Sequence, residues 1–74
     1  MAKSLTQRVL EVSVRKGEFN LAVARKSFKN YFADSVALDN SVMRRARELS
    51  NAGMLKRTGP GTYTPTKRGQ TAVA

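Results

Sequence analysis

The chain has no cysteine and no histidine, and these two absences exclude several kinds of functional site. Without cysteine there is neither a disulfide framework nor a thiolate metal site, and without histidine the commonest acid–base group is missing. The few carboxylates are scattered without the spacing of metal ligands or of an acid–base pair. They are Glu11, Glu18, Asp34, Asp39 and Glu48. We therefore expect no enzyme, no metal and no cofactor.

Long apolar segments are also lacking. No run approaches the ~20 residues that cross a membrane, and the first residues contain no unbroken apolar core of a signal peptide. We therefore expect no membrane association and a cytoplasmic location. With 74 residues, the chain is expected to form a single domain over 1–74 that buries only about 60% of its unfolded surface. Such a domain has no room for a small-molecule ligand.

Positive charge is abundant. The sequence contains 14 lysines and arginines against five acidic residues, a net charge of +9. Residues 44–68 hold seven of the basic residues and only one acidic residue. A basic protein of this kind is attracted to polyanions such as DNA or RNA. The alternative is a generally basic surface without a binding role, which the clustering disfavours.

The first segment, residues 4–16, is predicted to be a helix. Ser4 and Gln7 have the spacing of a capping box, and Gly17 is suited to end the helix. The alternating residues of VLEVSV make a strand the competing assignment, but the cap and the length favour a helix. Apolar residues fall on two opposite faces, so the helix is either sandwiched inside the domain or presents one face to a partner chain. The two sets are Leu5, Val9 and Val12, and Leu10 and Val14.

Residues 18–20 are short and extended, and could pair with a later hairpin. A second helix is predicted over about 21–32, with Ala24, Phe28, Tyr31 and Phe32 on its core face. Its opposite face carries Arg25, Lys26 and Lys29, which can reach phosphates. The connection 33–39 is not assigned to an element, although Asp34 and Ser35 could start a turn of helix. Within it, Val36 and Leu38 are expected to point inward.

A basic helix is predicted to start near Asp39, Asn40 or Ser41, which are all good N-cap residues. At 100° per residue, its core stripe contains Val42, Ala46 and Leu49. The opposite line contains Asn40, Arg44, Arg47 and Asn51, and Arg45 flanks the core stripe. Arginine and asparagine can form paired hydrogen bonds to guanine and adenine edges. Base recognition is therefore preferred to the alternatives of phosphate contact or a merely solvated face.

A β-hairpin is predicted after this helix. Gly53 can end the helix, with Met54 and Leu55 closing over its end. Residues 56–58 and 62–64 are predicted strands, joined by the turn-forming residues 58–61. Thr66 could cap a last segment over 67–73, which Gly69 weakens as a helix.

Two strings carry a family resemblance: RELSNAGMLKR at 47–57, and GTYTPTKRG at 61–69. They resemble the recognition helix and the wing of the winged helix-turn-helix family of DNA-binding proteins. The resemblance implies a mainly α fold with a small β-hairpin (α+β), consisting of three helices plus the wing. It places residues 40–47 in the major groove and the hairpin against the DNA backbone or the minor groove. The connection 32–39 is longer than the tight turn usual in that family.

The function implied is that of a small transcriptional regulator, or a phage-type or plasmid-type regulator, that binds duplex DNA in the nucleoid of a bacterial or phage-infected cell. The expected recognition-helix contacts are Asn40, Ser41, Arg44, Arg45, Arg47 and Asn51, and the expected wing and backbone contacts are Lys56, Arg57, Thr58, Gly59, Gly61, Lys67 and Arg68. Secondary phosphate contacts are expected from Arg25, Lys26 and Lys29.

Three further possibilities remain open at the level of sequence. A homodimer could form through the first helix or the C-terminal tail. The same fold could bind RNA or the ribosome. A protein-interaction module could dock on an acidic partner through an exposed apolar side of the first helix, formed by Leu10 and Val14.

Overall fold

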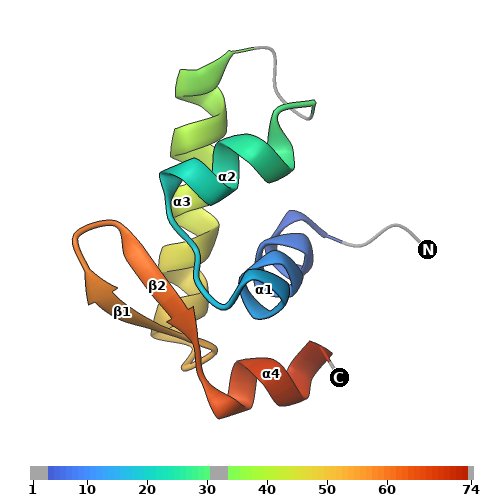
Figure 1. Ribbon diagram of the computed structural model, residues 1–74, viewed down its shortest axis with the longest axis vertical. Coiled ribbons are helices and arrows are strands. Elements are labelled where there is room, and N and C mark those ends of the chain that lie inside the picture. Colours follow the sequence, from blue (N-terminus) through green and yellow to red (C-terminus); the bar gives the residue numbers. More distant parts are fainter. Residues whose placement is uncertain (1–3, 31–33, 74) are drawn as a thin grey trace.

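Helices dominate the computed structural model, which describes residues 4–30 and 34–73. In chain order the elements are α1 (Leu5–Lys16), α2 (Leu21–Phe28), α3 (Ser35–Asn51), β1 (Leu55–Gly59), β2 (Thr62–Pro65) and α4 (Lys67–Val73) (Figure 1). The predicted class, mainly helical with an antiparallel hairpin, is confirmed. The predicted number of helices is wrong, since the described residues form four rather than three.

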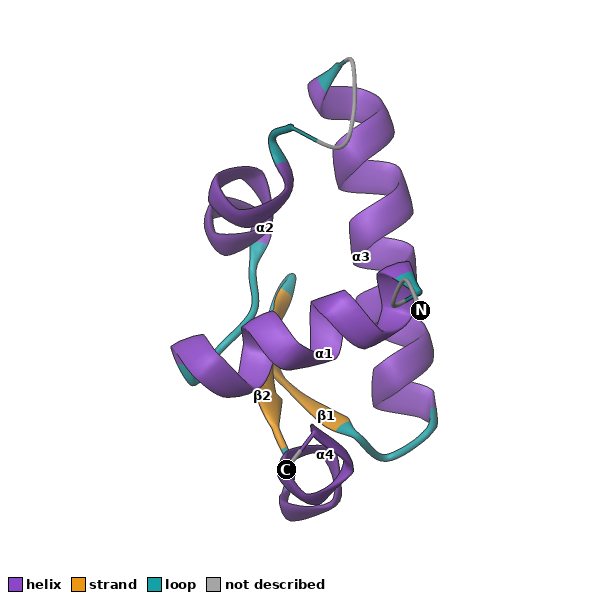
Figure 2. Ribbon diagram, turned by 90° about the vertical axis from the view of Figure 1, so that its right-hand side faces the viewer, coloured by secondary structure: helices purple, strands orange, loops and turns teal. Residues whose placement is uncertain are grey.

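Helix α1 begins and ends as predicted. The Ser4 hydroxyl accepts a hydrogen bond from the Gln7 amide, and the Gln7 side chain accepts one from the Ser4 amide. Gly17 ends the helix with φ of +83°, a conformation that glycine adopts without steric cost. The helix is sandwiched, because it contacts α3, β2 and α4 (Figure 2).

The expected free apolar side of α1 is not present. Leu10 is only 6% exposed, and Val14 packs against the core while remaining partly buried. Helix α4 covers this side: a Cβ added to Gly69 would lie 3.2 Å from Leu10 Cδ1. The sequence showed two apolar faces on α1, but it did not show that the last segment would fold back over one of them.

The extended residues after α1 pair with the hairpin, as predicted. Phe19 and Tyr63 exchange two backbone hydrogen bonds, with N···O distances of 2.7 and 2.8 Å. Strand β2 therefore lies between β1 and Phe19. Both side chains are buried, so this bridge joins the hairpin to the helical core.

The start of α3 corrects the sequence prediction. The helix begins at Ser35, where the Asp34 side chain accepts a hydrogen bond of 2.7 Å from the Ala37 amide. Residues 35–39 of the unassigned segment 33–39 therefore belong to α3. Leu38 is buried, as expected, but Val36 is 67% exposed and does not point inward. Leu38 extends the core stripe because it lies four residues before Val42.

Helix α2 is shorter than the predicted span of 21–32, since it ends at Phe28 and is followed by a turn at 29–30. Asn20 caps its start by accepting a hydrogen bond from the Val23 amide. Two members of the predicted core face, Ala24 and Phe28, are buried. The other two, Tyr31 and Phe32, lie outside the described residues.

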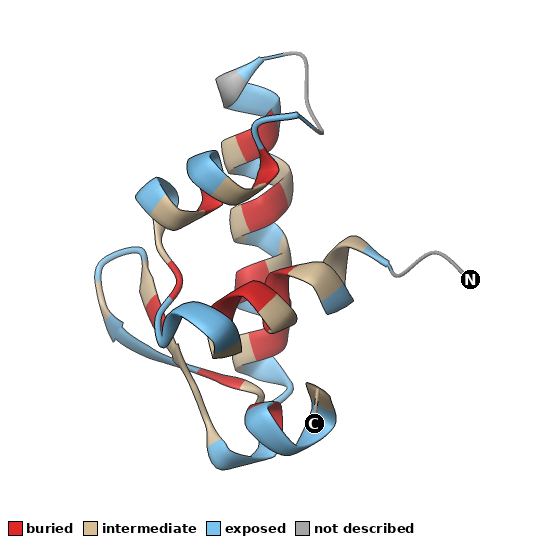
Figure 3. Ribbon diagram, turned by 45° about the vertical axis from the view of Figure 1, so that its right-hand side comes forward, coloured by how far each residue is buried: buried red, intermediate tan, exposed pale blue. Residues whose placement is uncertain are grey.

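The core lies where α1, α2 and the hairpin meet one face of α3 (Figure 3). The predicted stripe of α3 is confirmed, because Val42 and Ala46 are fully buried and Leu49 is nearly so. These residues form one core cluster with Phe19 and Phe28, and the opposite face of α3 is exposed.

The C-terminal end of α3 forms a Schellman motif. The Met54 amide bonds to the Leu49 carbonyl and the Gly53 amide to the Ser50 carbonyl, while Gly53 has φ of +81°. The predicted helix-ending role of Gly53 is thus confirmed. This reversal sends Leu55 into the core and starts the hairpin directly behind α3.

The final segment 67–73 is a helix despite its glycine. The Thr66 hydroxyl accepts a hydrogen bond of 3.1 Å from the Gly69 amide, which is the predicted cap. Gly69 is buried against the carbonyl oxygen of Met54, and a Cβ there would overlap that atom. The glycine that lowers helix propensity is therefore the residue that lets α4 pack closely.

Candidate nucleic-acid interface

The outer face of α3 carries an exposed line of hydrogen-bonding side chains. Asn40, Arg44, Arg47 and Asn51 are all exposed, as the helical periodicity predicted. Neither arginine forms a hydrogen bond or an ion pair with another residue of 4–30 and 34–73. Their donors are therefore available to a ligand that lies along this face.

Two acidic side chains of α3 flank the exposed line, and each is engaged by an arginine. Asp39 pairs with Arg25 of α2 at 2.8 Å, and Glu48 lies 3.5 Å from Arg45. Among the described residues, both carboxylates thus form their ion pairs with arginines other than Arg44 and Arg47. The exposed face of α3 is thus positively charged although the helix contains two acidic residues.

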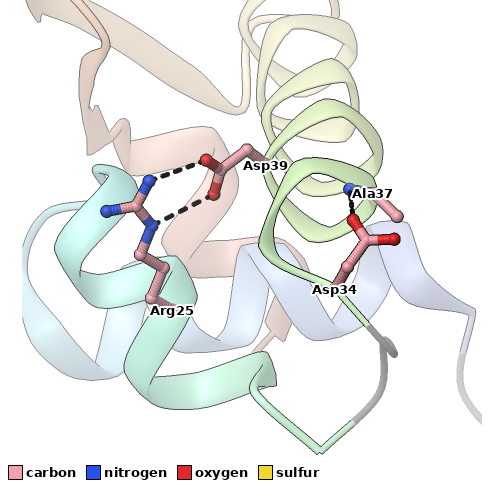
Figure 4. A network of polar contacts seen from close by, with 4 residues as sticks. All are labelled: Arg25, Asp34, Ala37 and Asp39. Atoms are coloured by element: carbon pink, nitrogen blue, oxygen red, sulfur yellow. Dashed lines mark hydrogen bonds and ion pairs between the residues drawn. The ribbon is translucent and has the colours of Figure 1, made fainter.

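The Arg25–Asp39 pair also connects α2 to α3 (Figure 4). Arg25 Nε and Nη2 each donate to one oxygen of Asp39, at 3.3 and 2.8 Å. This hydrogen bonding, together with the carboxylate charge, raises the pKa of the Arg25 guanidinium above its usual value. Arg25 was predicted to contact phosphates; here its fork geometry is used to hold α2 against α3.

Ser41 and Arg45 lie at the side of the exposed line. Both are partly buried, so Arg45 flanks the core stripe as predicted. With Asn40 and Arg44 they line a shallow depression of about 190 Å³. The Nε atom of Arg45 is buried and has no hydrogen-bond partner among the described residues. The Nη1 atom of Arg45 lies 3.5 Å from Glu48.

The register of the hairpin places Lys56 and Arg57, which were predicted to have the same role, on different faces. Lys56 pairs with Thr64, whereas Arg57 pairs with Tyr63. Because cross-strand partners share a face of the sheet, Arg57 emerges on the side of buried Tyr63, and Lys56 on the opposite side. Arg57 is further held by a hydrogen bond from its Nε to the Gly59 carbonyl at 3.3 Å.

The tip of the hairpin is narrow. Thr58 is the extra residue at an irregularity in the register between Arg57 and Gly59. No neighbouring atom lies within 4 Å of a Cβ added to Gly59 or Gly61. Because glycine has no side chain and the space beside both glycines is open, a ligand can approach the backbone at the tip closely.

The remaining predicted contacts lie away from the hairpin strands. Lys67 and Arg68 are exposed in the first turn of α4. Arg68 lies over the end of α3, where its Nη1 would be 3.4 Å from a Cβ on Gly53, a position at which a cation complements the helix dipole. Lys26 and Lys29 are exposed on α2 and its following turn.

One feature of this face was missed at the level of sequence. Because α3 begins at Ser35, its exposed line starts a turn earlier than predicted and includes Val36. The spacing of four residues between Val36 and Asn40 places both on one face. The available signal was the Asp34–Ser35 pair, which is as good a helix start as Asp39–Asn40.

No protein-family model matches this chain, and no significant match was found among curated proteins or solved structures. Across residues 4–30 and 34–73, no helix has the length and apolar character needed to cross a membrane. The described residues also contain no cluster of three or more histidine, cysteine or acidic side chains that could hold a metal ion.

Proposed function

We propose that the protein is a sequence-specific DNA-binding regulator with a winged helix-turn-helix fold, in which α3 is the recognition helix and the β1–β2 hairpin is the wing. The order of helix, extended bridge, two helices and hairpin supports this assignment, with β2 between β1 and Phe19. The observation that carries it is the exposed line of Asn40, Arg44, Arg47 and Asn51 on α3, in which neither arginine pairs with another residue of 4–30 and 34–73.

In the proposed mechanism, α3 enters the major groove and the protein acts by occupying its site, without chemistry. Arg44 and Arg47 read guanine, and Asn40 and Asn51 read adenine, through paired hydrogen bonds. The hairpin contacts the backbone through Lys56 or Arg57, which fixes the position of α3 but carries no sequence information. The Arg25–Asp39 pair connects α2 to α3 beside this face.

Salt dependence provides the first test. If the protein neutralises about four phosphates, the logarithm of the binding constant should fall with the logarithm of salt concentration at a slope of about −3.6. Affinity for duplex DNA should then drop about 100-fold between ~50 and ~200 mM salt. A binding constant that does not change with salt contradicts the proposal. Equal or tighter binding of RNA in direct competition favours the RNA-binding alternative.

The roles of individual residues are tested on a duplex site selected from random DNA. Arg44→Ala should lower the affinity for the selected site roughly 10-fold or more but should change the affinity for unrelated DNA little, because a paired contact contributes ~1–3 kcal/mol of discrimination between bases. Lys56→Ala should lower the affinity for all DNA sequences by a similar factor. Arg15→Ala is the charge-matched control, since Arg15 is exposed on α1, which packs on the core side of α3. An equal loss on every sequence for Arg44→Ala removes its readout role.

A further inference from the structure

We infer that Val36 is a specificity determinant of the proposed interface and recognises the 5-methyl group of a thymine in the major groove. The inference rests on the proposed function, since it assigns a base contact to the first turn of α3. Within the described residues, Val36 is the most exposed large apolar side chain, at 67%, and Leu21 follows at 39%.

Exposure alone is ordinary for a single apolar residue, so the position of Val36 is the decisive observation. It lies four residues before Asn40 and eleven before Arg47, so at 100° per residue its direction is within about 40° of both side chains. In a recognition helix, the N-terminal residues are the ones that reach base edges. Val36 lies in the first turn of α3 and thus in the part of a recognition helix that contacts base edges.

Helix stability does not explain a valine at this position. Valine is a poorer helix former than alanine because its branched side chain loses rotamer freedom in a helix. Its side chain is also outside the core formed by Leu38 and Val42. The helix start is secured instead by Asp34, whose side chain bonds to the Ala37 amide.

The chemistry of the groove offers one apolar partner. Among the four bases, only thymine presents a methyl group in the major groove, and apolar side chains contact it there. The neighbouring side chains Asn40 and Arg44 are polar or charged and cannot provide that contact. Since one helical turn rises ~5.4 Å and base pairs are ~3.4 Å apart, the thymine should lie one or two base pairs from the base read by Asn40.

The test compares duplexes that differ by one methyl group. Each thymine of the selected site is replaced in turn by deoxyuridine, and dissociation constants are measured for the wild type and for Val36→Ala. At one position, deoxyuridine should weaken wild-type binding roughly three- to fivefold, the effect of exposing one methyl-sized group. Val36→Ala should be weakened similarly on the thymine site and should lose nothing more on the deoxyuridine site.

Two controls keep this result interpretable. Val36→Ala should fold normally, because it removes exposed atoms and raises helix propensity, so its melting temperature should not fall. Leu21→Ala removes a second exposed large apolar side chain, which lies on α2, and should leave the full thymine–deoxyuridine difference intact.

Several results would overturn the inference. One is that the losses of affinity caused by Val36→Ala and by deoxyuridine add independently at every position. Another is that deoxyuridine has no effect on wild-type affinity at any position. A third is that the selected site contains no thymine. In each case salt-sensitive, sequence-selective binding by the wild type would still support the proposed function. A wild-type protein that does not bind duplex DNA would refute the proposed function itself.

Discussion

Replacement of Asp34 by alanine tests the start of α3, on which the exposed face depends. The Asp34 carboxylate accepts a 2.7 Å hydrogen bond from the Ala37 amide and satisfies a donor that has no partner within the helix. Loss of an aspartate N-cap costs about 0.5–2 kcal/mol, typically ~1. For a domain of this size, a change of ~1 kcal/mol corresponds to a drop of about 4–8 °C in melting temperature.

Replacement of Asp34 by asparagine distinguishes the effect of the capping hydrogen bond from the effect of the negative charge. Asp34→Asn keeps a capping oxygen and loses only the interaction of a negative charge with the helix dipole, about 0.3–1 kcal/mol. It should therefore be more stable than Asp34→Ala. On the proposed function, Asp34→Asn should bind DNA at least as well as the wild type, because a negative charge is removed near the groove. Asp34→Ala should bind more weakly, because the turn carrying Val36 frays.

Thermal unfolding and hydrogen exchange measure these effects. Asp34→Ala should accelerate amide exchange at residues 37 and 38, and Asp34→Asn should do so much less. If the helix instead started near Asp39, Asp34 would be a loop residue and its replacement would change stability by no more than ~0.5 kcal/mol. Equal melting temperatures for the wild type and Asp34→Ala would therefore refute the assigned start of α3.

Three further replacements test the packing around α3. Gly69→Ala should destabilise the protein by about 1–3 kcal/mol, although the same change in an open helix stabilises, because its Cβ would overlap the Met54 oxygen; a raised melting temperature would contradict this packing. Gly53→Ala should lower the free energy of unfolding by ~1–2 kcal/mol, because φ is +81° there. Calorimetry measures this loss, and Ala52→Gly is the control because it leaves glycine at position 53. Asp39→Asn should lower the melting temperature at low salt but match the wild type at ~1 M salt, where ion pairs are screened; a difference independent of salt would argue against the ion pair. Because the pKa of Arg25 is raised, the part of this stabilisation that comes from its charge should be present at neutral pH and should be lost as the pH rises through that pKa in strongly alkaline solution.

Local sequence signals were sufficient for most helix ends. The Ser4–Gln7 capping box, Gly17 and the Gly53 turn each depend on residues within one helical turn, so short-range chemistry decides them. The face of α3 that enters the core also followed from periodicity alone, since Val42, Ala46 and Leu49 are buried together. The same periodicity identified Asn40, Arg44, Arg47 and Asn51 as exposed.

The start of α3 and the place of Val36 did not follow from local signals. Asp34 and Asp39 are both suitable N-caps, and local chemistry does not rank them. The longer helix is favoured by tertiary contacts, because Leu38 is buried in the core and Asp39 is held by Arg25 of α2. Both contacts require α2 to lie beside α3.

By itself, the sequence determined that helices and a hairpin form, most of their ends, the core stripe of α3 and the strong positive charge, because these depend on neighbouring residues and composition. Only the tertiary structure decided that α4 covers Leu10, that Arg25 pairs with Asp39, and that Lys56 and Arg57 leave opposite faces of the hairpin. These features join residues that are far apart in the chain or depend on strand register. They arise from packing, which no local propensity encodes.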